Sequence, residues 1–136
     1  MRRVTPIILA ASAALVALDI LGALTGKPLG FPYSSLGVVS ILVYLGVGAF
    51  GAWRASFAAG LVGAAIVGFL DGTLGPLCAW LVGSGSVGQT ITEPGVFAYG
   101  IAVGTATAAA AGLIGAAAAS WLERRRGIRS SGVIPR

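Results

Sequence analysis

Four long apolar runs, separated by short polar turns, constrain this chain more than any other feature. They cover residues 4–24, 33–53, 55–82 and 96–122. The hydrocarbon core of a bilayer is about 30 Å thick, so a helix that rises ~1.5 Å per residue needs about 20 apolar residues to cross it. Each run is long enough. We therefore predict an all-α, polytopic membrane protein in which residues 1–136 form a single bundle of four transmembrane helices.

The composition agrees with a chain that lies mostly in lipid. Hydrophobic residues make up 57% of the chain and charged residues only 10%, whereas soluble domains contain about 45–50% and about 25% respectively. So few charges cannot cover a water-exposed surface. The first run follows Arg2 and Arg3, as in a signal peptide, but its length and the Asp19 within it favour a retained span.

Positive charge lies almost entirely on one side of the predicted membrane. Of the nine Lys and Arg residues, only Lys27 falls on the other side. The arginines of the basic side are Arg2, Arg3, Arg54, Arg124, Arg125, Arg126, Arg129 and Arg136. Because basic segments stay cytoplasmic, we predict a cell (inner or plasma) membrane protein with both termini in the cytoplasm. We also expect contacts with lipid headgroups from Arg2, Arg3, Arg54, Arg124, Arg125 and Arg126.

The residue types missing from the sequence exclude much enzyme chemistry. The chain has no histidine and one cysteine, Cys78, which excludes Cys/His zinc sites, an intramolecular disulfide and Ser-His nucleophile pairs. We expect no enzymatic activity, no cofactor and no metal. The net charge of +5 does not indicate a nucleic-acid partner, because the cations flank apolar runs instead of alternating with aromatic residues on a soluble face.

Glycines at four-residue spacing predict close helix packing. Helices in lipid associate through small residues that let their backbones approach. Two such pairs are Gly68 with Gly72 and Gly100 with Gly104. We predict that Gly68, Gly100 and Gly104 lie at helix contacts. These contacts belong either to the bundle itself or to an oligomer, and the sequence leaves both open.

Asp19 and Asp71 are the only carboxylates inside the apolar runs. Both lie about 15 or 16 residues from the cytoplasmic end of their spans, at similar depth. An acid there costs about 2.5–3.5 kcal/mol on insertion scales, which makes it a functional candidate. With the mid-span hydroxyl of Tyr44, these acids form the predicted intramembrane polar site. The alternative for Asp19 is a place at the outer headgroup level.

Gly72, Gly75 and Pro76 follow Asp71 closely and predict a break in the third helix. Proline cannot donate its backbone hydrogen bond, and freed carbonyls in a membrane need protein or water partners. A broken helix beside an acid is typical of ion and substrate sites. A simple packing kink is the alternative.

The first and third runs resemble each other around their acids. Residues 13–19 read AALVALD and residues 64–71 read AAIVGFLD. Each run is followed by a proline and then by a helix that ends at tryptophan and arginine. This pattern indicates two direct-repeat helical hairpins, although apolar sequence of low complexity also produces such similarity by chance.

Two classes of function fit these features. The first is an assembly or accessory subunit that acts through helix–helix contacts, with the bilayer and either itself or another membrane protein as partners. The alternative is a small oligomeric channel, or a proton- or cation-coupled transporter, that uses Asp19 and Asp71. The two classes differ in whether Asp71 faces a water-accessible cavity or a helix contact.

Overall fold

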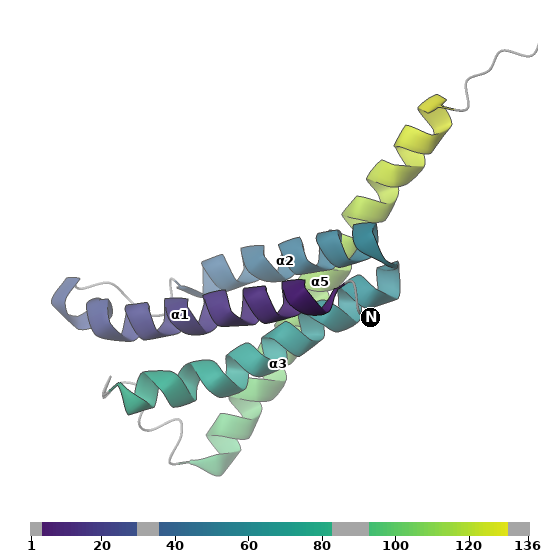
Figure 1. Cartoon of the computed structure of the whole chain (residues 1–136). Coiled ribbons are helices and arrows are strands. Elements are labelled where there is room, and N and C mark those ends of the chain that lie inside the picture. The colour runs from purple at the N-terminus through teal and green to yellow at the C-terminus, as the bar shows by residue number, and fades with distance from the viewer. Residues whose placement is uncertain (1–3, 30–35, 83–92, 131–136) are drawn as a thin grey trace, which may run out of the picture.

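The computed structural model describes residues 4–29, 36–82 and 93–130, which form four α-helices (Figure 1). They are α1 (Thr5–Leu29), α2 (Leu36–Arg54), α3 (Phe57–Leu81) and α5 (Pro94–Ser130). All four are long and apolar enough to cross a bilayer. The predicted fold class, an all-α four-helix membrane bundle, is confirmed. The chain is a multi-pass membrane protein.

Local sequence explains where the later helices begin. Only Ala55 and Ser56 separate α2 from α3, and the Ser56 hydroxyl accepts a hydrogen bond of 3.2 Å from the Ala59 backbone N–H. This is a helix N-cap, which satisfies a donor that the first turn cannot. Pro94 opens α5, at a position where proline loses no helical hydrogen bond. With 37 residues, α5 is about 55 Å long at ~1.5 Å per residue and extends beyond an apolar core of about 30 Å.

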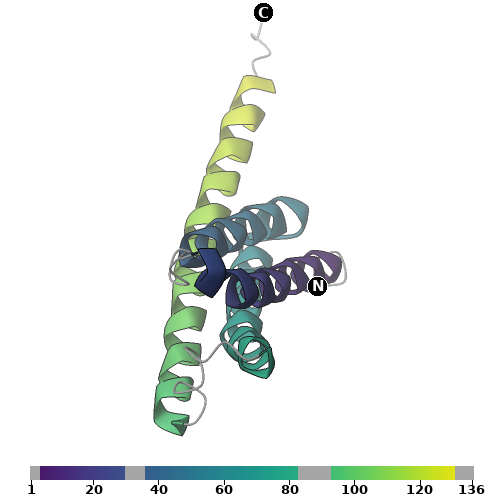
Figure 2. The ribbon, with the colours of Figure 1, turned by 90° about the vertical axis from the view of Figure 1, so that its left-hand side faces the viewer.

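The helices alternate in direction, and α5 crosses the others steeply. In Figure 1, α1 and α3 begin at the end of the bundle where α2 finishes and from which α5 leaves. Figure 2 shows α5 running at a large angle across α2 and α3. These three helices all contact one another, whereas α1 lies mainly on α3 and does not reach α5 in the described part of the chain.

The two halves of the chain are therefore not packed as equivalent hairpins. α3 and α5 share an extensive contact, whereas α1 and α2 share only a small one. The helices also differ in length, with 19 residues in α2 and 37 in α5. The duplication itself stays a prediction from the sequence.

Backbone-to-backbone contacts hold α2, α3 and α5 together. A methyl group on Gly48 would overlap the carbonyl of Gly112, and one on Gly60 would overlap the carbonyl of Gly48. A methyl on Gly115 would overlap the carbonyl of Leu45. Any side chain at these positions would push the helices apart. Around them lies a small core of buried apolar side chains, comprising Leu15, Tyr44, Val47, Ala64, Val67, Ala108 and Ala111.

The three glycines predicted to lie at contacts behave differently. A methyl on Gly68 would overlap that of Ala108 and lie 3.1 Å from the Gly104 carbonyl oxygen, so Gly68 is part of the α3–α5 contact. A methyl on Gly104 would find its nearest neighbour, the Gly68 carbonyl oxygen, at 3.9 Å. Gly100 is exposed, with nothing within 4 Å of a Cβ there. The backbone of Gly100 nevertheless lies near α3, because a Cβ at Gly72 would be 3.9 Å from the Gly100 carbonyl oxygen.

The predicted break in the third helix is also wrong. α3 is continuous from Phe57 to Leu81, with Pro76 inside it. A proline removes a single backbone donor, and packing on both sides can hold the flanking turns in helical form. Here a Cβ at Gly72 would lie 3.3 Å from the Cα of Ile101 on α5, and Gly75 lies against Asp19 on α1. Contacts on two sides thus support the helix at the proline.

Candidate intramembrane polar site

A hydrogen bond between α2 and α3 is the centre of the candidate site. The Tyr44 hydroxyl donates to Oδ2 of Asp71, across 27 positions in sequence. Tyr44 is only 4% exposed, and Asp71 is half-buried. Hydrogen bonds between membrane helices contribute on average about 0.6 kcal/mol. The structure thus brings together two of the three residues that the sequence predicted for this site.

The second oxygen of Asp71 has no partner. Within the described residues, Oδ1 is buried without a hydrogen bond, as is the hydroxyl of Thr105 on α5. A buried polar atom left unpaired costs about 1–3 kcal/mol, and more when the group is charged. The site therefore retains hydrogen-bonding capacity that the described part of the protein does not use.

Asp71 also lines an open groove between α2, α3 and α5, here called the Asp71 groove. Its volume is about 410 Å³. Its lining residues are Gly37, Val38, Ser40, Ile41, Tyr44, Asp71, Gly104 and Thr107. Four of these carry polar side chains, and the others make an apolar wall. Asp71 thus both contacts a neighbouring helix and faces a cavity, whereas the sequence suggested one placement or the other.

Ser40 extends the polar surface along α2. It lies one helical turn before Tyr44 and lines the same groove. Gly37, Ser40 and Tyr44 are spaced so that they share one helix face. This spacing is the signal in the sequence that could have identified the groove. Gly37 and Gly104 matter there because their missing side chains leave the space open.

Asp19 approaches the same region from α1. A methyl on Gly75 would overlap its Oδ2, so the carboxylate lies directly against the backbone of α3. Gly75 is one helical turn from Asp71, on the same side of the helix. All four helices therefore contribute to the neighbourhood of Asp71, with α1 supplying a second carboxylate.

The donor set limits what the site can hold. No group of three or more His, Cys, Asp or Glu side chains lies together among the residues that the structure describes. The polar atoms at hand are two carboxylates and several hydroxyl groups. These suit a proton, a monovalent cation or an organic amine better than a divalent metal, which takes six or more oxygen ligands or fixed geometry.

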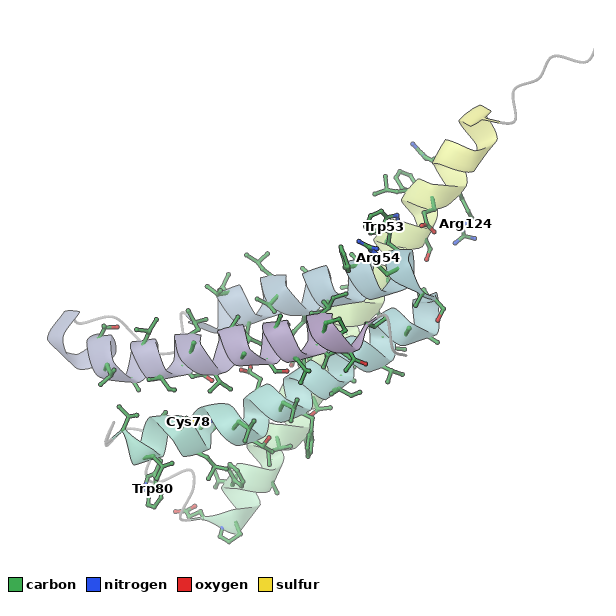
Figure 3. All side chains as sticks on the ribbon, in the orientation of Figure 1. Trp53, Arg54, Cys78, Trp80 and Arg124 are labelled. Atoms are coloured by element: carbon green, nitrogen blue, oxygen red, sulfur yellow. The ribbon has the colours of Figure 1, made fainter. Side chains whose placement is uncertain are left out.

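The basic end of the bundle is a second region where residues predicted from the sequence lie together. Figure 3 shows Trp53, Arg54 and Arg124 gathered at this end and Trp80 at the other. The Arg54 guanidinium lies 5.1 Å from the Trp53 ring centroid, and that of Arg125 lies 3.7 Å from the Trp121 centroid. Tryptophan and arginine together are typical of a membrane–water interface. Arg2, Arg3 and the side chain of Arg126 lie outside the described residues.

Comparisons with known protein families, with curated proteins and with solved structures found no match to this chain.

Proposed function

We propose that this chain is a small membrane transport protein, a channel or a proton- or cation-coupled transporter, whose polar site is Asp71 with Tyr44. One observation supports this above all others: Asp71 lines an open groove, and its buried Oδ1 has no hydrogen-bond partner among the residues that the structure describes. An acid at membrane depth is expensive. A bundle that needed only packing at this position would be served better by an apolar side chain.

The chemistry of the site suits a single positive charge. Asp71 accepts a proton or cation, and Tyr44 and Ser40 provide hydroxyl groups that pass or orient it along α2. Asp19 adds a second negative charge one helical turn away. The apolar wall made by Val38 and Ile41 also accommodates an organic cation with a hydrophobic body.

Flux in reconstituted vesicles tests this function. We expect Asp71→Asn to abolish proton- or cation-coupled flux while the bundle stays folded, because Asn keeps the shape and part of the hydrogen bonding. Glu93→Gln is the matched control, since it is the same chemical change at an exposed carboxylate outside the groove. Flux in Asp71→Asn equal to that of the parent, for protons, monovalent cations and organic amines alike, would reject the proposal.

A second candidate function, an assembly or accessory subunit, is favoured by the outer face of α5. Ala102, Ala106, Ala110 and Ala117 are all exposed there at helical spacing. Such a face suits close packing with a second copy or with another membrane protein. Ala106→Leu should then reduce the assembled mass in detergent and leave flux unchanged. An unaltered mass would argue against this face as an interface.

We also propose that both termini are cytoplasmic. In support, α2 ends at Arg54 and α5 carries Arg124 and Arg125 at the same end of the bundle. In a Cys78→Ser background, a cysteine placed at Glu93 should react with an impermeant reagent added outside cells. One placed at Arg125 should react only after the membrane is opened. The reverse pattern would invert the topology.

A further inference from the structure

A second groove lies between α2 and α5 at the arginine end, here called the interfacial groove. Its volume is about 300 Å³. It is lined by Gly46, Ala49, Phe50, Trp53, Ala119, Leu122 and Glu123. The small residues make its floor, and the aromatic residues and Leu122 make its walls. Glu123 is the one charged residue in the lining, so the interior is almost wholly apolar.

Arg54 holds a positive charge at this groove. Its guanidinium lies 5.2 Å from the centroid of Phe50 and 5.1 Å from that of Trp53, and both rings line the groove. Within the described ranges it has no carboxylate as an ion partner. Cation–π contacts fix the guanidinium and leave its N–H groups able to donate. Arg124 and Arg125 on α5 outweigh the charge of neighbouring Glu123.

We propose that the interfacial groove binds an anionic phospholipid, with one acyl chain on its apolar floor and the phosphate on Arg54. The two parts of the site match the two parts of this ligand. Arginine recognises phosphate through charge-assisted hydrogen bonds. A hollow of about 300 Å³ is at the lower end of ligand pockets, which measure roughly 300–1,000 Å³. It is better suited to one chain than to a helix about 10 Å across.

Native mass spectrometry of the whole protein tests this site, with phosphatidylglycerol and phosphatidylcholine of identical acyl chains as probes. We expect phosphatidylglycerol to be retained about tenfold more strongly, which corresponds to about 1.4 kcal/mol. Arg54→Gln should reduce its retention to the level of phosphatidylcholine. Arg54→Lys should retain part of the preference, because it keeps the charge and loses the planar fork.

The apolar half of the site is tested by filling it. Gly46→Leu places a side chain in the groove, and because nothing lies within 4 Å of a Cβ there, the bundle should fold unchanged. Its matched control is Gly100→Leu, the same change at a glycine that is equally open but outside the groove. We expect phosphatidylglycerol retention to fall with Gly46→Leu and to stay at the parental level with Gly100→Leu.

Four results would overturn the proposal. The first is equal retention of both lipids by the parent. The second is equal retention of phosphatidylglycerol by Gly46→Leu and Gly100→Leu, with both variants folded by circular dichroism. The third is a loss of phosphatidylglycerol retention with Glu123→Gln, because removing a negative charge from the lining should strengthen the binding of an anionic lipid. A parent that dimerises and releases lipid as it does so would assign the groove to a second copy and equally reject the lipid.

Discussion

The Asp71 groove and the interfacial groove have the same structural origin and opposite chemistry. α2 and α5 touch where Gly48 meets Gly112 and where Gly115 meets the carbonyl of Leu45. Because α5 crosses α2 steeply (Figure 2), the two helices separate on both sides of this point. One separation leaves the Asp71 groove, and the other leaves the interfacial groove.

The side chains placed at each separation make the difference. The Asp71 groove has a carboxylate and three hydroxyl groups, whereas the interfacial groove has an apolar floor and an arginine at its mouth. The first suits a small cation within the membrane, and the second suits a lipid phosphate at its surface. Glycines at one helix crossing thus create both grooves, while a few charged residues determine what each groove can bind.

The largest loss of stability is expected from a change at the point where α2 and α5 cross. Gly48→Ala puts a methyl group onto the backbone of Gly112, where no flexible side chain can move aside. Overpacking of this kind costs about 1–3 kcal/mol. We expect the midpoint of thermal unfolding in detergent to fall more than for any other variant described here. Gly46→Ala, two residues away and unobstructed, should unfold like the parent. A similar loss in both variants would mean that the crossing is not the point that fixes the two helices.

The next largest effect on stability is expected at Gly68, and it should distinguish Gly68 from Gly104, which faces it beside the Asp71 groove. A methyl group on Gly68 would overlap that of Ala108, whereas a methyl on Gly104 would have about an ordinary contact distance of 3.9 Å. Gly68→Ala should therefore lower stability by about 1 kcal/mol, at the low end of overpacking. Gly104→Ala should leave the unfolding midpoint unchanged. If Gly104→Ala proves the more harmful of the two, α3 and α5 are closer near the groove than this geometry allows.

The four helices could be predicted from the sequence, but their rotations could not. Apolar runs of bilayer length leave little choice of element, and the bounds agree to within a few residues at most ends. In lipid, however, both the inner and the outer face of a helix are apolar, so the periodic signal that marks the buried face of a soluble helix is lost. Gly100 and Gly104 belong to one spacing motif and both have a carbonyl oxygen near α3, yet a Cβ would meet α3 only at Gly104.

The two residues of the polar site, in contrast, could be predicted from the sequence. Asp71 and Tyr44 stand out because a polar group in lipid costs free energy, and pairing with another polar group reduces that cost. The groove beside them depends on the crossing angle of α5, which no local pattern encodes. The error at Pro76 arose because a helix break was judged from the local run of Gly72, Gly75 and Pro76, without the support that Ile101 and Asp19 give to α3.

The hydrogen bond at the site is expected to have a smaller effect on stability than either packing change. A double-mutant cycle of Tyr44→Phe and Asp71→Asn measures it directly. Such bonds in membrane proteins couple by about 0.6 kcal/mol on average and by no more than about 1.7. We expect a coupling in this range from chemical or thermal unfolding. Additive effects of the two changes would show that the pair does not interact in the membrane, and the polar site would lose its central contact.

The smallest effect on stability should come from Gly75→Ala. This change displaces one carboxylate beside the Asp71 groove and alters nothing at the interfacial groove. The new methyl group would overlap Oδ2 of Asp19, which is the far end of a flexible side chain and can rotate away. We expect a change in the free energy of unfolding within about 0.5 kcal/mol, the range of substitutions that disturb no special feature. The carboxylate, however, would leave its place one helical turn from Asp71. If its charge acts on the site, the pH profile of flux should change in the same direction as in Asp19→Asn, while phosphatidylglycerol retention stays parental. A large loss of stability instead would mean that Asp19 is fixed in place and supports the fold more than the site.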